Sequence, residues 1–298
     1  MKKKIVSFGL LFVTILTLFT GCGKEEVEKY GLFNESGELV IGYNAFAEKY
    51  GFNLGTDYIH PDEWNAFLED SEQYGTNLTL KIPETATFVR QLNNWNGISY
   101  IEIPNSVTEI GGFAFSQSSL KRIEIPDGVT KIESDTFWKC YELEEVIIPN
   151  SVTEFGVNVF ASCENLTSIK LPENITEISK SLLGHCKNLK NVTIPVNVTK
   201  IGDWALGGTA IEDITVPDGV TEIGEYAFSN CKNLKTLILP ASLENIGECS
   251  FWTSDDDRNV ELTIYFKGTE EQWNNLIAGI ELVHDDSTKV ICNYSENK

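Results

Sequence analysis

The sequence of 298 residues contains only three histidines and lacks the short motifs of the common enzyme classes. His60, His185 and His284 stand far apart, and none belongs to a His-Glu-x-x-His pair that binds zinc. A Gly-x-Ser-x-Gly nucleophile turn, a Gly-x-x-x-x-Gly-Lys phosphate loop and a dinucleotide fingerprint are also missing. No nucleophile–base pair or metal cluster can be assembled, so we expect no enzymatic activity, cofactor or metal.

Basic residues are scarce as well. Lys and Arg number 23 against 44 Asp and Glu, which gives a formal net charge of −21 at pH 7. Nucleic acids require basic patches that neutralise their phosphates, so the composition excludes nucleic acid as a partner. It also argues against broad electrostatic adhesion to anionic membranes. A solvated exterior explains the acidity, and partners with basic patches are the alternative.

The one long apolar run, residues 5–19, is short for a membrane-spanning helix and follows three lysines, which is the layout of a signal peptide. It is followed by Thr-Gly-Cys ending at Cys22, which resembles a bacterial lipobox, although Phe19 stands where leucine is commoner. We expect residues 1–21 to be removed and Cys22 to be lipidated, with a plain secretion signal as the alternative. The product would be a lipoprotein at the bacterial cell surface, attached to the membrane through its lipid anchor only, with residues 22–30 as a tether.

Proline is also rare, and eight of the nine prolines are almost evenly spaced. The intervals between them are 21, 22, 23, 23, 23, 22 and 23 residues. Each proline ends a short apolar run whose alternation indicates a strand with one side chain inward and the next outward. Proline suits the end of a strand because it has no N–H for the interior of a ladder. The periodic prolines are Pro83, Pro104, Pro126, Pro149, Pro172, Pro195, Pro217 and Pro240.

In the seven repeats from Pro104 onward, three further positions are apolar. Counted from the proline, Val, Ile or Leu stands at position three, Ile or Phe at position six, and Phe or Leu at position eleven. A period of this length predicts stacked coils that depend on their neighbours. We therefore expect an α/β repeat solenoid of about 23 residues per coil, built from short strands and one helical turn near position eleven.

The repeat from Pro217 to Leu234, PDGVTEIGEYAFSNCKNL, resembles the leucine-rich repeat of BspA-like bacterial surface proteins. The similarity extends from about Leu78 to Leu276, and the tail Leu262–Leu276 is similar to the segment that often ends such arrays. Leu183 and Leu206 depart from the pattern by replacing phenylalanine. The resemblance implies adhesion to host or matrix proteins, or coaggregation with other cells.

Capping segments flank the predicted leucine-rich repeat solenoid, which we place at residues 77–261. Apolar residues at helical spacing predict a helical N-terminal cap over residues 31–76, which would cover the open edge of the first coil. A small separate domain is the alternative. Residues 262–298 form the predicted C-terminal cap, in which Lys289–Tyr294 could add a last strand.

Four of the seven cysteines occupy one repeat position, fourteen residues after a proline. They are Cys140, Cys163, Cys186 and Cys231. Coils about 4.8 Å apart cannot bring four such thiolates to within about 2.3 Å of one zinc ion. We expect buried free thiols that pack as small apolar groups. Cys249 and Cys292 lie off this column, and a disulfide between them is an alternative.

The remaining candidate site is the face formed by the outward side chains of the strands, since every coil of a repeat protein contributes to such a face. Ile147 and Ile238 point outward although the repeat does not require apolar residues there. Trp138 and Trp252 are either exposed anchors or side chains packed between coils. The predicted partner-binding residues are Tyr100, Glu102, Arg122, Glu124, Glu145, Ile147, Lys170, Asn191, Thr193, Asp213, Thr215, Thr236 and Ile238.

The sequence therefore predicts a cell-surface lipoprotein whose solenoid binds an external macromolecule. The expected partner is a protein or glycan outside the cell, on a host, in a matrix or on another cell surface. A structural or scaffolding role in the bacterium's own envelope is the alternative, and an enzyme is the least favoured reading.

Overall fold

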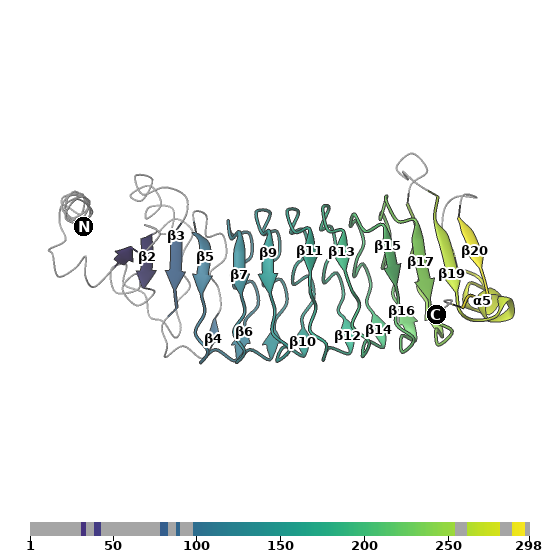
Figure 1. The fold of residues 1–298 in the computed structure, drawn as a ribbon, viewed down its shortest axis with the longest axis horizontal. Coiled ribbons are helices and arrows are strands. Elements are labelled where there is room, and N and C mark those ends of the chain that lie inside the picture. The colour runs from purple at the N-terminus through teal and green to yellow at the C-terminus, as the bar shows by residue number, and fades with distance from the viewer. Residues whose placement is uncertain are drawn as a thin grey trace, which may run out of the picture.

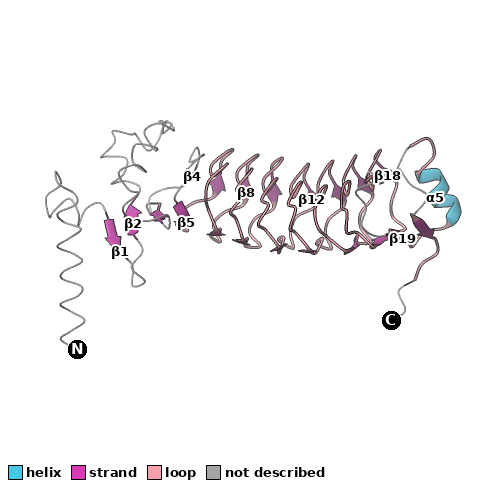
Figure 2. Ribbon diagram, turned by 90° about the horizontal axis from the view of Figure 1, so that it is seen from above, coloured by secondary structure: helices cyan, strands magenta, loops and turns pink. Residues whose placement is uncertain are grey.

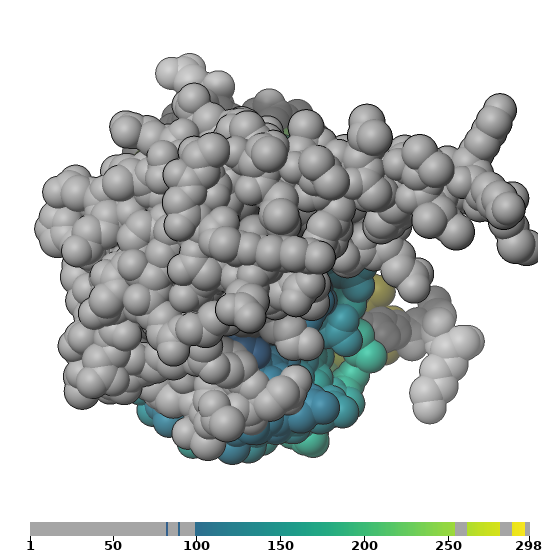
Figure 3. Space-filling model, turned by 90° about the vertical axis from the view of Figure 1, so that its left-hand side faces the viewer, coloured from purple at the N-terminus to yellow at the C-terminus, as the bar shows by residue number. Residues whose placement is uncertain are grey.

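Short strands repeat along one axis and give the molecule the shape of a rod (Figure 1). The computed structural model confirms the predicted parallel-strand solenoid. Viewed from one end, the coils near residue 100 lie in front of those that follow them in the sequence (Figure 3). The structure describes residues 31–33, 39–42, 78–82, 88–89, 98–253, 261–280 and 288–295.

The strands that precede the periodic prolines form one side of the rod, called here the strand face. β1 (Gly31–Phe33) and β2 (Leu39–Gly42) are antiparallel, and the later pairs are parallel. The sheets run in the orders β1-β2-β3-β5-β7-β9, β11-β13 and β15-β17-β19-β20. Their remaining bounds are β3 Leu78–Lys81, β5 Ile98–Glu102, β7 Arg122–Glu124, β9 Glu145–Ile147, β11 Ser168–Ile169, β13 Asn191–Val192, β15 Asp213–Thr215, β17 Thr236–Leu239, β19 Thr263–Phe266 and β20 Lys289–Ile291.

The Val-Thr-x-Ile segments form a second row of strands, called here the second face. Its sheets run in the orders β10-β8-β6-β4 and β12-β14-β16-β18, and all their pairs are parallel. The view from above shows how this row repeats along the rod (Figure 2). The strands are β4 Phe88–Val89, β6 Glu109–Ile110, β8 Lys131–Ile132, β10 Glu154–Phe155, β12 Glu177–Ile178, β14 Lys200–Ile201, β16 Glu222–Ile223 and β18 Asn245–Ile246.

The third side of each coil, called here the turn side, comprises residues 111–118 and their equivalents. The sequence predicts a helical turn there, but the structure has successive hydrogen-bonded turns instead. Alternate amides donate to carbonyls of the next coil, as Phe115 does to Thr136 (2.8 Å) and Phe137 to Val159 (2.9 Å). A helix would need these amides for carbonyls four residues earlier in the same coil, so stacking and helix formation exclude each other here.

Two residues of each turn side adopt the left-handed backbone conformation. Phe113 has φ of 57° and Gln117 has φ of 58°, and Asp135 and Lys139 repeat the pair in the next coil. A residue in the left-handed conformation changes the direction of the peptide groups beside it. Alternate amides of the turn side therefore point along the rod axis, toward the next coil. Side chains other than glycine are strained in this conformation, so the inter-coil bonds must offset that strain.

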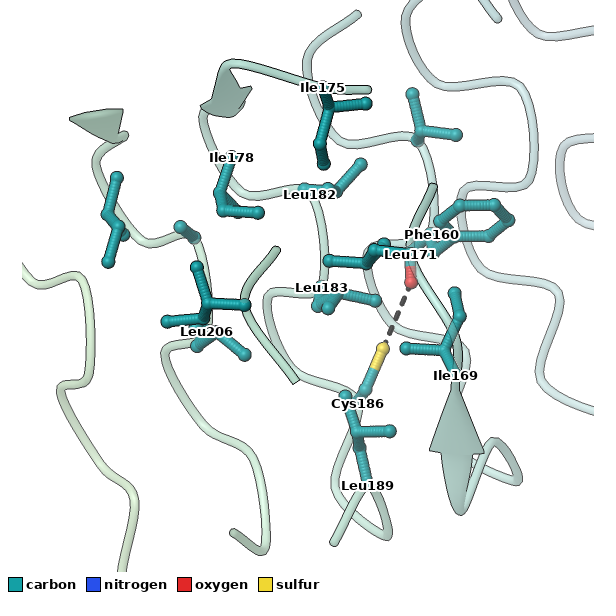
Figure 4. Close-up of a cluster of buried hydrophobic side chains, with 14 of the residues drawn as sticks. Phe160, Ile169, Leu171, Ile175, Ile178, Leu182, Leu183, Cys186, Leu189 and Leu206 are labelled. Atoms are coloured by element: carbon teal, nitrogen blue, oxygen red, sulfur yellow. Dashed lines mark hydrogen bonds between the residues drawn. The ribbon is translucent and has the colours of Figure 1, made fainter. Parts of the chain in front are cut away.

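The core is a set of apolar columns, one residue per coil, and it confirms the three predicted positions. Phe137 is fully buried and stacks between Phe115 and Phe160, with ring centroids 5.3 Å and 5.2 Å apart. Leu183 and Leu206 continue the same column as buried side chains, and other leucines and isoleucines lie near them (Figure 4). Burial of these side chains at every level holds each coil to the next.

The C-terminal end combines two strands with the helix α5 (Glu270–Leu276). A capping box at Thr269 starts the helix, since its side chain accepts from Gln272 N–H and the Gln272 side chain accepts from Thr269 N–H. Trp273 is buried against Phe266, with ring centroids 5.5 Å apart. The predicted last strand is confirmed as β20, which pairs with β19.

At the other end, the described parts of the predicted helical cap are strands. β1 and β2 form a hairpin-like pair, and β2 extends the strand face by pairing with β3. Strand addition satisfies the backbone groups at the edge of the first coil, which a helix lying across it would leave open. The rest of residues 31–76, the segment 1–21, the tether and Cys22 lie outside the described residues. Among the residues that the structure describes, no helix is long and apolar enough to cross a membrane.

Candidate binding surface

The strand face carries two columns of outward side chains separated by one buried column. In β7 and β9 the outer residues are exposed and the central Ile123 and Val146 are buried. Register places Tyr100 beside Arg122, then Glu145, and in the second half Asp213 beside Thr236. The predicted residues therefore form one surface along the rod, as the alternation required.

The charges of this surface concentrate in its first half. Arg122 Nε lies 3.2 Å from Glu145 Oε2, and both side chains are half exposed. The pKa of Tyr100 is raised by partial burial and then by the carboxylates of Glu124 and Glu102, while Arg122 opposes the rise. An exposed ion pair contributes little to stability, so these groups remain available to a partner.

Ile147 interrupts the charged half with an exposed apolar side chain, 38% of which is accessible. Glu124 precedes it and Lys170 follows it at the same repeat position, and both are exposed. An apolar group surrounded by polar ones suits the centre of a protein interface. Ile238, the second apolar residue predicted outward, is half-buried.

The second half of the strand face is mostly uncharged. Asn191, Thr193, Asp213 and Thr215 are exposed, and Thr236 is half-buried. These short polar side chains offer hydrogen-bond donors and acceptors to a protein or a glycan.

Sequence reasoning missed residues that extend this surface beyond the eighth proline. Tyr265 of β19 pairs in register with Ile238 and Ile291, and its ring lies 4.6 Å from that of Tyr294. The alternation of outward and buried side chains in Thr263–Phe266 could have indicated this strand, but no proline follows it as in the other repeats. The result is an apolar patch at the C-terminal end of the strand face.

The second face is organised differently. A threonine column runs along it, in which Thr130, Thr199 and Thr221 each donate a hydroxyl to the carbonyl of the preceding threonine. Beside it Lys131 pairs with Glu109 (3.3 Å) and Lys200 with Glu222 (3.0 Å). Because these hydroxyls are already partnered within the rod, the second face differs from the strand face mainly in its threonine column, while its ion pairs are exposed like the Arg122–Glu145 pair.

The cysteine column is confirmed as free, buried thiols. Each thiol donates to a carbonyl of the preceding coil: Cys140 to Phe115 (3.0 Å), Cys163 to Phe137 (3.3 Å), Cys186 to Phe160 (3.1 Å; Figure 4) and Cys231 to Leu206 (3.3 Å). Burial raises the pKa of Cys140 to about 11 and that of Cys186 to about 12. The thiols therefore remain protonated donors.

Cys249 and Cys292 are also free, so the alternative disulfide between them is not formed. Within the described residues, no three His, Cys, Asp or Glu side chains are grouped as a metal site. The column of thiols is thus a structural feature, and the candidate site of this molecule is a surface.

The tryptophans predicted either as anchors or as packing residues are both half-buried. Lys139 Nζ lies 4.2 Å from the centre of the Trp138 ring. A different aromatic column, which the sequence analysis did not identify, runs along the turn side. Trp204 stacks on Tyr226 at 4.6 Å and on His185 at 5.8 Å. These rings face one another across coils, so they stabilise the stack.

The family described as BspA type leucine rich repeat region matches this chain in six copies. The matched residues are 90–212 and 201–272, which together span more than half of the chain. No match is found among curated proteins.

Several solved structures of leucine-rich repeat proteins are similar to this chain. A leucine-rich repeat protein from Bacteroides ovatus is similar at 27% identity and a TM-score of 0.54, over 72% of this chain and 62% of that one. This chain therefore spans less than two thirds of that protein. A leucine-rich repeat protein of T. pallidum matches at 18% identity and a TM-score of 0.44, over 73% of this chain and 81% of that one. A leucine-rich cell surface protein from Faecalibacterium prausnitzii matches at 18% identity and a TM-score of 0.30, over 83% and 95%.

Proposed function

The chain belongs to the BspA-type leucine-rich repeat family, and on this premise we propose that it is a cell-surface lipoprotein whose strand face binds a macromolecule outside the cell. The observation that carries the proposal is the strand face itself, a continuous row of exposed side chains to which every coil contributes. A solenoid presents an extended surface in place of an enclosed pocket. Such a surface suits a protein or a glycan better than a small molecule.

The charge pattern supports a protein partner in the first half of the face. Glu124 pairs in register with the exposed Ile147, and the Arg122–Glu145 ion pair lies on the same two strands, so apolar contact and charge recognition occur together. Complementary charges set specificity and association rate more than affinity. The affinity would then come from Ile147 and its neighbours, and the selectivity from the charges.

The location is proposed from the N-terminal sequence. The three lysines, the apolar run and Cys22 have the order of a lipoprotein leader. Lipid on Cys22 would hold the rod against a membrane through the tether 22–30, with the strand face free to meet partners.

A binding panel tests the proposal. Protein comprising residues 23–298 is assayed by surface plasmon resonance against matrix proteins, mucins and glycans. We expect saturable binding to at least one of them, weakened at least about tenfold by the double variant Arg122→Glu/Lys170→Glu. The matched control, Lys180→Glu/Lys187→Glu, makes the same change of charge away from the strand face and should bind normally.

The alternative, a scaffolding role in the bacterial envelope, makes a different prediction. Pull-down from the cell's own envelope fraction would then recover partners through the same residues, while the external panel shows no saturable binding. Equal loss of binding in both double variants would refute a role for the strand face in either case.

A further inference from the structure

Both strand ladders of the rod stop between the same two coils. On the strand face one sheet ends at β9 and the next begins at β11, and on the second face the sheets divide between β10 and β12. The strand face also divides between β13 and β15, but there the second face continues from β12 to β18. Within residues 98–253, the junction after the β9–β10 coil is therefore the one place where neither face is continuous. We call it the seam.

The backbone bonds show what is missing at the seam. Thr153 donates its amide to Thr130 (3.0 Å) and Thr199 donates to Thr176 (2.9 Å), which are the usual links between coils on this side. Between these pairs, the described backbone has no hydrogen bond from Thr176 to Thr153. The coils are neighbours in the stack, yet they lack the ladder that joins the others.

A larger side chain stands at the seam. Six of the seven repeats have Ile at position six after the proline, and the seventh has Phe155. Its side chain is only half-buried, and its ring meets that of Phe160 edge-on at 6.1 Å. A phenylalanine ring is larger than the isoleucine that this position holds in the other six repeats, so it cannot pack in the same space.

The charges at the seam also oppose close pairing. On the second face Lys131 is paired with Glu109, and Lys200 with Glu222. Glu154 and Glu177 occupy this repeat position on the two sides of the seam, both exposed, with no lysine between them. Like charges on adjacent strands repel each other.

Three sets of contacts still cross the seam, and one of them joins Glu164 on one side to Lys187 Nζ (2.7 Å) and to Asn188 Nδ2 (2.8 Å) on the other. On the turn side, Asn158 donates to Lys180 (3.0 Å), Phe160 to Leu182 (2.9 Å) and Ser162 to Gly184 (2.8 Å), and the Ser179 hydroxyl donates to Gly156 (2.7 Å). At the opposite corner, where the chain passes from the strand face to the second face, the hydrogen bonds involve the side chains of Asn150 and Asn174. Asn150 Oδ1 accepts from the amide of Glu173 (3.1 Å), and Asn174 Nδ2 donates to the carbonyl of Asn150 (3.0 Å).

We propose that the rod consists of two rigid stacks, residues 98–166 and 167–253, which open and close at the seam. The turn side is the hinge, whose backbone bonds across the seam are strained and loosened when the stacks open, and Asn150 at the opposite corner is the clasp. Opening would change the distance between Ile147 on the first stack and Lys170 on the second. The strand face would thereby adjust its curvature to the shape of a bound macromolecule.

Hydrogen exchange of the free protein distinguishes a moving seam from a static gap. The amides of Asn158, Phe160 and Ser162 donate across the seam, and those of Ser181, Leu183 and His185 donate across the next junction at similar distances of 2.8, 2.9 and 2.6 Å. A static gap predicts equal protection of the two sets. An opening seam predicts that the first set exchanges at least about fivefold faster, after correction for intrinsic rates.

Matched variants test the clasp. Asn150→Ala removes the side-chain acceptor of the Glu173 amide at the seam and leaves the backbone carbonyl that accepts from Asn174 Nδ2, whereas Asn197→Ala removes one side-chain bond, to the carbonyl of Glu173 (2.9 Å), at the next junction. We expect Asn150→Ala to accelerate the seam amides by about a further fivefold, and Asn197→Ala to change its own junction by no more than about twofold.

Equal exchange of the two sets of amides in the unmodified protein overturns the proposal, whatever the variants do. Equal effects of the two substitutions overturn the role of Asn150 as clasp. No binding partner is used in these experiments, so their outcome is independent of the function proposed above.

Discussion

Replacing Phe137 by alanine tests whether the aromatic column holds the coils together. Phe137 is 0% exposed and lies between two stacked rings, those of Phe115 and Phe160. Truncation of a buried phenylalanine costs about 3–5 kcal/mol. Loss of the two stacked pairs, each worth about 0.5–1.5 kcal/mol beyond burial, places the expected cost in the upper part of that range.

A conservative control is present in the chain itself. Leu183 and Leu206 occupy the same repeat position and are fully buried or nearly so, which shows that leucine fits the column. Phe137→Leu should therefore reduce the free energy of unfolding by about 1–1.5 kcal/mol. The difference between the free energies of unfolding of the two variants separates the cost of the cavity from the cost of losing the aromatic ring.

The assay is urea denaturation followed by the fluorescence of Trp138, which lies next to the substituted residue, and by far-ultraviolet circular dichroism. If Phe137→Ala lowers the free energy of unfolding by less than about 1 kcal/mol, and the slope of that free energy against urea concentration is unchanged, the reasoning is refuted. It would mean that the coils are held mainly by their backbone bonds.

Three further predictions concern the turn side, the thiols and the leader. Ser162 has φ of 62°, and Gly208 occupies the same repeat position in a later coil with φ of 74°. Ser162→Gly should therefore raise the free energy of unfolding by about 0.5–1 kcal/mol. As a control, Ser168→Gly in the extended strand β11 should lower it by a similar amount. Burial raises the pKa of Cys140 to about 11 and that of Cys186 to about 12, above that of a solvated thiol, so the folded state binds these protons more tightly and the free energy of unfolding should fall as pH rises above 9. Urea titrations at pH 8 and pH 10 check this, with Cys140→Ser as the comparison; a steeper fall in the variant would contradict it. Cys22→Ser should release the protein from the membrane fraction of an expressing bacterium and abolish labelling by radioactive palmitate, and retention of the label in the variant would rule out Cys22 as its site.

Much of the fold follows from spacing in the sequence. The even prolines mark the strand ends, and the apolar residues at three, six and eleven positions after them are the buried columns. The prediction succeeded because a repeat uses the same environment in every coil, so each position is observed several times within one chain. The cysteine column was predicted for the same reason.

The row of outward side chains on the strand face could be predicted, because alternation along a strand decides which side chains point outward. Its end was missed: Tyr265 lies in a strand without a following proline, and Ile238 is half-buried beside it. Exposure depends on neighbours from other strands, which the pattern of one strand does not contain.

The sequence by itself determined the length of the coil, the inward columns and the outward face, since these depend on local period and on the burial of apolar side chains. Tertiary structure alone decided the path of the turn side and the place of the seam. On the turn side, local preference favours a helical turn, but the amides gain partners in the next coil and adopt left-handed turns instead. At the seam, nothing in the spacing of the sequence marks Phe155, Glu154 and Glu177, and only the stacking of the coils brings them to the junction where both ladders stop.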